Sequence, residues 1–301
     1  MTHIPRLALG TASFGMAYPP GSGSPRPTGA ESAAMLRHAY ERGVRWFDTG
    51  AAYGDAEDRV DDAFRGSPRF YTTTTKVAAD IFECGYWRRS RPVWTHILVH
   101  NPVLADFDPA SILMKFHADL QALSGPGCGI DGASVYTPAE AHAAIAAGLR
   151  IIQVPYHALD QSHAKAGVFE AARAAGVTVM ARQPWCRGLL LLPRGRLTIL
   201  PLLRLGFDGA DVVNMANAIS QFQFVCDRHA ISYVEAGLRF SLESLADVVV
   251  FGVSSMAQLQ QDLDIAASVP PLAWAACYAE LLATFADAGV TLASVCTPEV
   301  K

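Results

Sequence analysis

The stretch GVRWFDTGAAYG, residues 43–54, contains the pattern that decides the fold. Its first part, residues 44–47, is a short strand-like run, and Asp48 and Tyr53 follow where that run ends. Parallel barrels and open parallel sheets place their active sites at the carboxyl ends of their strands. The stretch therefore predicts a parallel strand that delivers a carboxylate and a phenol to a site at its end.

The next two strand-like runs end in polar residues in the same way. Lys76 follows the run 70–75, and His100 follows the run 97–99. An acid, a phenol, an amine and an imidazole at the ends of neighbouring strands would form a site for proton transfer. We call these four residues the tetrad: Asp48, Tyr53, Lys76 and His100.

Short apolar runs alternate with helical patterns along the chain. The eight strand candidates are residues 7–10, 45–48, 70–76, 94–100, 132–136, 151–155, 177–182 and 248–251. Most are continuous apolar or β-branched runs, as expected of parallel strands that helices cover. Eight strand–helix repeats predict an α/β fold, a (β/α)8 TIM barrel, in a single domain over residues 1–301.

The segments between and after the strands add detail to this prediction. Amphipathic helical stripes span residues 164–175 and, after the last strand, residues 256–266. Proline and glycine residues between positions 184 and 209 predict a long loop that caps the barrel mouth. The segment 272–288 predicts an accessory C-terminal helix on the outside of the barrel.

Composition excludes several classes of protein. The chain is 51% hydrophobic and 17% charged, which allows a large core, and its net charge of −4 argues against nucleic-acid binding. No stretch is apolar for long enough to span a membrane. The start lacks a secretory signal and the six cysteines are widely spaced, so we expect a cytoplasmic protein with free thiols. A small-molecule substrate is the expected partner, and the oligomeric state stays open.

These residues, in this order, resemble the aldo-keto reductases over nearly the whole chain. The matching segments are residues 9–15, 46–57, 76, 99–102, 132–136, 152–156, 188–190 and 252–259. The most specific part is Asp-x4-Tyr-Gly-x-x-Glu, followed by a lysine and a histidine at the next two strand ends. Within the family, the chain is most similar to a bacterial branch associated with sugar or secondary-metabolite pathways.

The resemblance implies reduction of a carbonyl by hydride from NAD(P)H, or the reverse oxidation. Tyr53 would donate the proton to the developing alkoxide. Lys76 would favour the phenolate and lower the pKa of Tyr53. Asp48 would hold Lys76 charged, because a buried ammonium without a partner is costly. His100 would orient the carbonyl oxygen.

Each member of the tetrad also has a purely structural interpretation. Asp48 before Thr-Gly is typical of a helix N-cap, and Tyr53 alone would be a packed aromatic residue. Lys76 alone would be a solvated strand end, and His100 a buried imidazole with its hydrogen bonds satisfied. Because four such residues rarely fall together at successive strand ends, their joint placement favours the catalytic interpretation.

The resemblance also implies a nicotinamide site, with two departures from the family pattern. Ser134 and Gln153 match residues that contact the carboxamide, but Val135 stands where the family has asparagine. Arg182 stands where the family stacks an aromatic ring on nicotinamide. A guanidinium can stack on a ring, but it repels the oxidised, cationic form, which favours the reduced cofactor.

The junction after the last strand is the expected phosphate-binding segment. Gly252, Ser254, Ser255 and Gln258 stand at the corresponding positions, where backbone N–H groups at a helix start can bind phosphate. Members that prefer NADPH place a lysine or arginine there, but residues 240–300 contain neither. The cofactor is therefore expected to be NADP(H) or NAD(H), with the preference open, and an ordinary helix cap is an equally good interpretation of the segment.

Two further groups are candidates for substrate contact. His157, followed by Asp160 and His163, comes after the sixth strand, and Trp185 opens the loop after the seventh. The spacing of the two histidines and the aspartate could indicate a metal, but the family needs none, so no metal site is expected. We expect His157 and Trp185 to contact the substrate.

Two other functions stay open at this point. One is a non-redox lyase, dehydratase or epimerase that uses the tetrad for proton transfer, since the cofactor signature is incomplete. The other is a sensor subunit that only binds the cofactor, although such a subunit has little use for all four tetrad residues.

Overall fold

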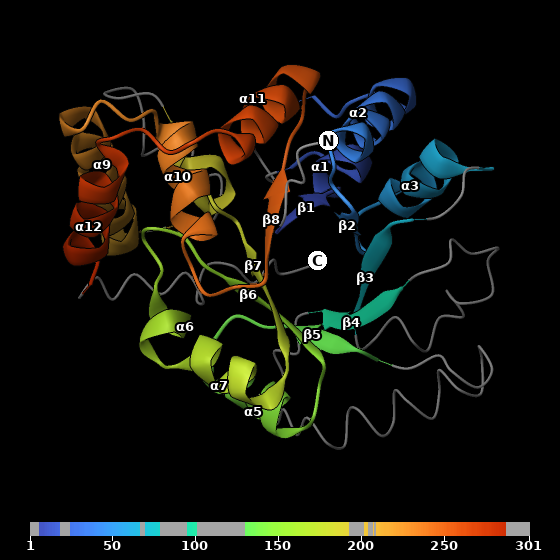
Figure 1. The fold of residues 1–301 in the computed structure, drawn as a ribbon, viewed down its shortest axis with the longest axis horizontal. Coiled ribbons are helices and arrows are strands. Elements are labelled where there is room, and N and C mark those ends of the chain that lie inside the picture. Colours follow the sequence, from blue (N-terminus) through green and yellow to red (C-terminus); the bar gives the residue numbers. More distant parts are fainter. Residues whose placement is uncertain are drawn as a thin grey trace.

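A closed barrel of eight parallel strands forms the centre of the molecule (Figure 1). The computed structural model describes residues 6–18, 25–66, 70–78, 95–100, 130–192, 202–203, 207 and 209–286. The strands neighbour one another in chain order, and β8 pairs with β1. They are β1 Leu7–Gly10, β2 Trp46–Asp48, β3 Thr72–Ala78, β4 His96–His100, β5 Gly132–Ser134, β6 Ile151–Pro155, β7 Thr178–Arg182 and β8 Val248–Gly252. The predicted (β/α)8 TIM barrel is confirmed.

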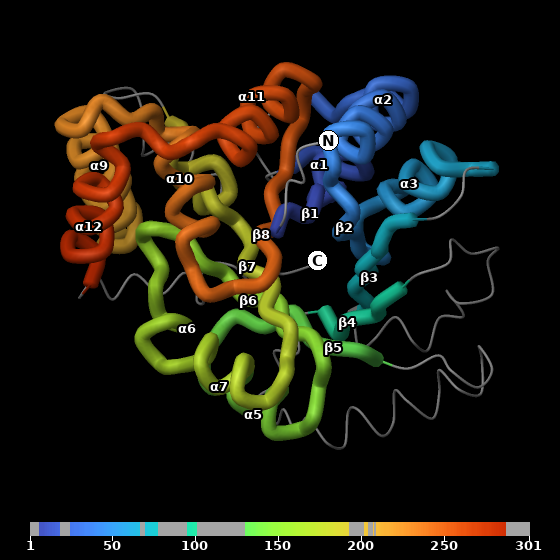
Figure 2. Tube along the Cα trace, in the orientation of Figure 1, coloured from blue at the N-terminus to red at the C-terminus, as the bar shows by residue number. Residues whose placement is uncertain are grey.

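Helices surround the strands (Figures 1 and 2). The described helices are α1 Ala12–Gly15, α2 Gly29–Glu41, α3 Ala56–Phe64, α5 Pro138–Ala146, α6 Ser162–Lys165, α7 Val168–Ala175, the 3₁₀ helix η3 Cys186–Leu191, α9 Gly209–Arg228, α10 Tyr233–Leu242, α11 Met256–Ala267 and α12 Trp274–Thr284. Thr28 and Thr137 begin α2 and α5 with capping boxes, in which the threonine and a glutamate three residues later satisfy each other's backbone N–H groups.

The predicted helical stripe over residues 164–175 is divided in two. Gly167 has a φ of 70°, a left-handed conformation that glycine adopts without steric cost, and it separates α6 from α7. The buried residues of α7 are Val168, Phe169 and Ala172, and of the predicted stripe of Ala164, Val168, Ala171 and Ala175 only Val168 is among them. The stripe after β8 is confirmed, since Leu259 and Leu263 of α11 are fully buried.

Two predictions about the C-terminal half have different outcomes. The accessory helix exists as α12, which packs against α9 and α10 outside the barrel and buries Trp274, Cys277 and Leu281 (Figure 1). The predicted long loop after β7 is only partly a loop, because residues 186–191 form η3, which buries Cys186, Leu189 and Leu190. Residues 193–201 of that loop lie outside the described part of the chain.

The side chains that point into the barrel determine where the site lies. Six apolar side chains pack together inside the barrel, before the carboxyl ends of the strands: Ala8, Leu98, Ile151, Met180, Val248 and Val250. Gly132 also lies in this layer, where a Cβ would come within 2.0 Å of the Ile151 carbonyl oxygen. Strand side chains alternate between faces, so the residue two positions beyond an inward-facing one also points inward. The inward positions at the carboxyl ends are therefore polar and form the barrel mouth.

Candidate active site

Six inward-facing polar residues line the mouth, each at or near the carboxyl end of a different strand. They are Asp48, Lys76, His100, Ser134, Gln153 and Arg182. Strand pairing fixes part of this ring directly, because His100 pairs with Ser134 and Ser134 with Gln153. The barrel thus brings together three tetrad residues and three of the residues expected to bind the cofactor.

A buried ion pair joins two members of the tetrad. Lys76 Nζ lies 2.7 Å from Asp48 Oδ2 and also donates to the Thr49 carbonyl oxygen at 2.7 Å. Lys76 is 1% exposed, so it is not a solvated strand end. Burial lowers the pKa of Lys76, and the Asp48 carboxylate opposes that shift. The contact is the one expected if Asp48 holds Lys76 charged.

Tyr53 lies against the other two tetrad side chains. Lys76 Nζ is 5.0 Å from the centre of the Tyr53 ring, and the His100 ring packs edge-on at 5.8 Å between centroids and 89° between planes. A Cβ at Gly50 would touch the Tyr53 ring at 3.3 Å, so glycine leaves room for the ring above the strand end. The four tetrad residues therefore converge.

Close backbone contacts hold the turn that carries Tyr53. A Cβ at Gly15 would lie 1.6 Å from the Tyr53 carbonyl oxygen, and one at Gly54, whose φ is 61°, would lie 2.3 Å from the Gly15 carbonyl oxygen. Substitution of either glycine would require the loop after β1 and the Tyr53 turn to separate.

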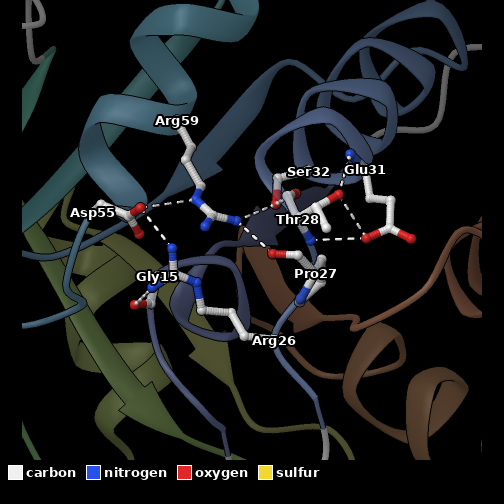
Figure 3. Close-up of polar contacts among 8 residues, drawn as sticks. All are labelled: Gly15, Arg26, Pro27, Thr28, Glu31, Ser32, Asp55 and Arg59. Atoms are coloured by element: carbon white, nitrogen blue, oxygen red, sulfur yellow. Dashed lines mark hydrogen bonds and ion pairs between the residues drawn. The ribbon is translucent and has the colours of Figure 1, made fainter.

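Ion pairs next to this turn reinforce it (Figure 3). Asp55 Oδ2 lies 2.6 Å from Arg26 Nη2 and 3.2 Å from Arg59 Nε. Arg26 also donates to the Gly15 carbonyl oxygen, and Arg59 to the Pro27 carbonyl oxygen. The network links the segment before α2 to the start of α3, directly after the Tyr53 turn.

The pKa of Tyr53 moves in the direction opposite to the one expected from the sequence. Burial raises the pKa of Tyr53 well above 10, and the nearby Asp48 charge raises it further, while the Arg182 charge lowers it. The expected net lowering of the Tyr53 pKa was wrong, because the sequence does not reveal the cost of burying a phenolate. Tyr53 in this site is a protonated phenol at neutral pH.

His100 is neutral in this environment. Burial, followed by the positive charges of Lys76 and Arg182, lowers the pKa of His100 to about 3. A neutral imidazole has one N–H donor and one acceptor nitrogen, so it can donate a hydrogen bond without carrying charge.

Gln153 and Ser134 connect to the tetrad. Gln153 Nε2 donates to Asp48 Oδ1 at 2.9 Å, and Ser134 Oγ donates to Gln153 Oε1 at 3.3 Å. Both side chains are 1% exposed. A chain of hydrogen bonds thus runs from Ser134 through Gln153 and Asp48 to Lys76, a link that sequence reasoning missed because these residues are far apart in the chain.

Arg182 contributes a second buried cation. It is 8% exposed at the end of β7, with its Cζ 4.4 Å from the centre of the Tyr136 ring and its Nη2 3.4 Å from the Val135 carbonyl oxygen. Its charge lowers the pKa of both Lys76 and His100, as expected of a cation that shares their pocket.

The segment after β8 forms the start of α11. Ser255 caps the helix through the Gln258 backbone N–H, and the Gln258 side chain accepts hydrogen bonds from the backbone and hydroxyl of Ser254. These contacts are those of an ordinary helix cap. Gly252 is exposed, and a Cβ there would meet only the Gly10 carbonyl oxygen, at 3.9 Å. The backbone at the end of β8 is therefore open to a ligand.

The two candidates for substrate contact are both buried. His157 is 0% exposed, and neither of its ring nitrogens has a hydrogen-bond partner among the described residues. Burial lowers the pKa of His157 and of His163 to about 4. Trp185 donates from Nε1 to the Val234 carbonyl oxygen at 2.9 Å. In the part of the chain that the structure describes, no three His, Cys, Asp or Glu side chains are grouped to hold a metal ion.

Glu57 is a site residue that the sequence analysis did not single out beyond its place in the motif. It is 7% exposed in the first turn of α3 and accepts a hydrogen bond from Thr75 Oγ1 at 2.5 Å. Burial raises the pKa of Glu57 to about 7, while the Thr75 hydrogen bond opposes the shift. Because Thr75 precedes Lys76, this contact ties α3 to the strand that carries Lys76.

Comparison with known proteins agrees with this fold. The model of the aldo/keto reductase family matches residues 6–125 and 128–272. No curated protein matches the chain. An aldo-keto reductase from Bacillus halodurans, solved in its holo form, is 16% identical with a TM-score of 0.67, over 92% of this chain and 91% of that one. A glycerol dehydrogenase from Gluconobacter oxydans is 19% identical with a TM-score of 0.67, over 93% and 92%.

The closed barrel and its polar mouth define an α/β-barrel protein with a buried cluster of ionisable side chains at the carboxyl ends of its strands. The family match covers most of the chain, so the chain belongs to the aldo/keto reductase family, a family of oxidoreductases. None of the described helices has the length and apolar character needed to cross a membrane.

Proposed function

We propose that the protein reduces an aldehyde, ketone or sugar-like carbonyl to an alcohol with NAD(P)H, or catalyses the reverse reaction. The observation that carries this proposal is the convergence of Tyr53 on Lys76 and His100, with Asp48 bound to Lys76. A small-molecule carbonyl substrate is the partner that such a set of groups fits.

The site residues divide the chemistry among them. Tyr53 gives its proton to the carbonyl oxygen, and its raised pKa keeps that proton in place until the oxygen becomes strongly basic. Neutral His100 donates a hydrogen bond that orients the oxygen. The Lys76 ammonium stabilises the developing negative charge, and Asp48 keeps Lys76 charged and in place.

A bound nicotinamide cofactor would supply the hydride. Ser134, Gln153 and Arg182 surround the place where its ring would lie. The open backbone at Gly252 and the start of α11, with Ser254, Ser255 and Gln258, fit its phosphate groups. NADP(H) and NAD(H) both satisfy this arrangement. His157 and Trp185, which follow the carboxyl ends of β6 and β7, are assigned to the substrate side.

The test compares the amount of cofactor oxidised with the amount of alcohol formed. Purified protein is incubated with a panel of aldehydes, ketones and sugars, and both cofactor consumption and alcohol formation are measured with NADH and with NADPH. Equal amounts of cofactor oxidised and alcohol formed are expected for at least one pair. Failure of both cofactors to bind would contradict the proposal.

A non-redox reaction on the same tetrad is the second candidate. It is favoured by the hydrogen bond from Gln153 to Asp48, which occupies one of the N–H groups expected to contact the cofactor. A lyase, dehydratase or epimerase would convert its substrate in the absence of NAD(P)H and would not consume added NAD(P)H. The same assay without NAD(P)H therefore separates the two functions.

A further inference from the structure

The accessory helix α12 packs against α9 outside the barrel through polar as well as apolar contacts (Figures 1 and 2). Glu280 of α12 lies 2.7 Å from Nη1 of Arg228, the last residue of α9, and 2.8 Å from Nε2 of His229, the next residue. Phe222 of α9 and Leu281 of α12 are fully buried. Contacts of both kinds therefore hold the two helices against each other.

Two cysteines meet in this interface. Cys226 of α9 and Cys277 of α12 are both 0% exposed, and their thiols are hydrogen-bonded to each other. They lie far apart in the sequence, so the packing of α12 on α9 is what brings them together. A disulfide bond is about 2 Å long, so sulfur atoms in hydrogen-bond contact need to approach each other by only about 2 Å to form one.

The hydrogen bond makes the two thiols unequal. It lowers the pKa of Cys277, although burial and the charge of Glu280 oppose that shift. The same hydrogen bond, together with burial, raises the pKa of Cys226. Cys277 is thus the thiol that ionises first, while Cys226 keeps its proton. Because the thiolate is the form that attacks a disulfide, Cys277 is the attacking group.

We propose that Cys226 and Cys277 form a reversible disulfide bond, with a low-molecular-weight disulfide as the oxidant, that links α12 to α9. The Cys277 thiolate attacks one sulfur of the oxidant, and the other sulfur leaves as a thiolate. Cys226 then loses its proton and attacks the Cys277 sulfur, which releases the second half of the oxidant. The two cysteine protons end on the two released thiols. One S–S bond forms and one is reduced, and an excess of thiol reverses the reaction.

The burial of both sulfurs determines how this reaction proceeds. Since neither cysteine is exposed, the oxidant reaches Cys277 only when α12 moves briefly away from α9, so oxidation should be slow. Once formed, the bond removes conformations from the unfolded chain and so stabilises the folded protein. The oxidised protein should therefore melt about 5 °C or more above the reduced protein. The proposal is independent of the proposed function, because α12 lies outside the barrel.

The test maps the bond and measures its effect on stability. Full-length protein is incubated with 2-hydroxyethyl disulfide, remaining thiols are blocked with iodoacetamide, and proteolytic peptides are analysed by mass spectrometry without reduction. A peptide pair joined through Cys226 and Cys277 is expected, together with the rise in Tm, and dithiothreitol should abolish both. Absence of the joined pair overturns the inference, as does a joined pair without any rise in Tm.

Two variants assign the effect to this pair. Cys277→Ala should form no joined pair with Cys226 and should show no rise in Tm after the same treatment. Cys186→Ala removes a buried cysteine of η3 and is the matched control, which should keep both the joined pair and the rise. A rise in Tm that persists in Cys277→Ala overturns the inference. If Cys277→Ala does not fold, the peptide map and the melting of the wild type decide.

Discussion

Gln153 Nε2 donates a 2.9 Å hydrogen bond to Asp48 Oδ1 across the interior of the barrel, from β6 to β2. The two strands are not neighbours, so this bond fixes Asp48 from the side opposite to Lys76. Both carboxylate oxygens of Asp48 are therefore engaged, one by an amide and one by an ammonium. Gln153, which was expected to contact the cofactor, therefore also positions Asp48.

Replacing Gln153 should affect both stability and turnover. Gln153→Leu leaves one oxygen of the buried Asp48 carboxylate without its donor, which should lower the free energy of unfolding by about 1–3 kcal/mol. We expect kcat to fall about tenfold or more, because Lys76 is then held by a less constrained partner. Chemical denaturation and steady-state kinetics measure the two effects. The exposed Gln260→Leu on α11 is the control, and equal effects of both variants would contradict the assignment.

Much of the fold could be predicted because it depends on local patterns. All eight strands lie where apolar runs were found, although β3 begins two residues later than expected and ends at Ala78. The interruption at Gly167 was missed because an isolated glycine within a helical stripe is compatible with a continuous helix. The tetrad could be predicted because each member follows a strand or belongs to its end, and the barrel topology determines the rest.

What could not be predicted depends on burial and on contacts across the barrel. The Gln153–Asp48 bond joins residues 105 positions apart, and nothing in the local sequence of either indicates the other. The predicted direction of the Tyr53 pKa shift was wrong, because the prediction considered the charge of Lys76 but not the cost of burial. Glu57 was missed for the same reason, because its burial cannot be read from the sequence.

The buried ion pair predicts strong coupling between its partners. Lys76→Met leaves the Asp48 carboxylate buried with only Gln153, and Asp48→Asn leaves the ammonium without its counter-ion. Each single change should cost about 3–5 kcal/mol of unfolding free energy, and the double variant should cost clearly less than their sum. Denaturant titrations of the four proteins measure the coupling. Additive effects would show that the pair does not interact energetically.

Glu57 predicts a pH-dependent stability. Its pKa is raised from 4.5 to about 7, so between these values the folded protein keeps a proton that the unfolded chain releases. Stability from this residue is therefore lost as pH rises from 4.5 to 7, by up to about 3 kcal/mol.

Substitution of Glu57 tests this directly. Glu57→Gln keeps a neutral acceptor for Thr75 and should be as stable as the wild type near pH 4.5 but more stable at pH 8. Thermal melts across this range follow the difference. The exposed Glu41→Gln at the end of α2 is the matched control and should show no such trend. A pH-independent difference for Glu57→Gln would refute the assignment.

His100 should remain neutral throughout the physiological range. Its pKa of about 3, lowered by burial and then by Lys76 and Arg182, places protonation far below pH 5. Nitrogen-15 chemical shifts of the labelled imidazole should show no titration between pH 5 and 8. A midpoint near 6.5 would mean that His100 is solvated and is not the neutral hydrogen-bond donor assigned to it.

If Tyr53 is the proton donor, Tyr53→Phe should lose most of its activity. The variant keeps the ring that packs on His100 but loses the proton, so kcat for carbonyl reduction should fall by about 100-fold or more while the dissociation constant of the cofactor stays nearly unchanged. Tyr278→Phe on the accessory helix α12 is the matched control and should retain full activity. A Tyr53→Phe variant that turns over at the wild-type rate would show that Tyr53 is not the proton donor.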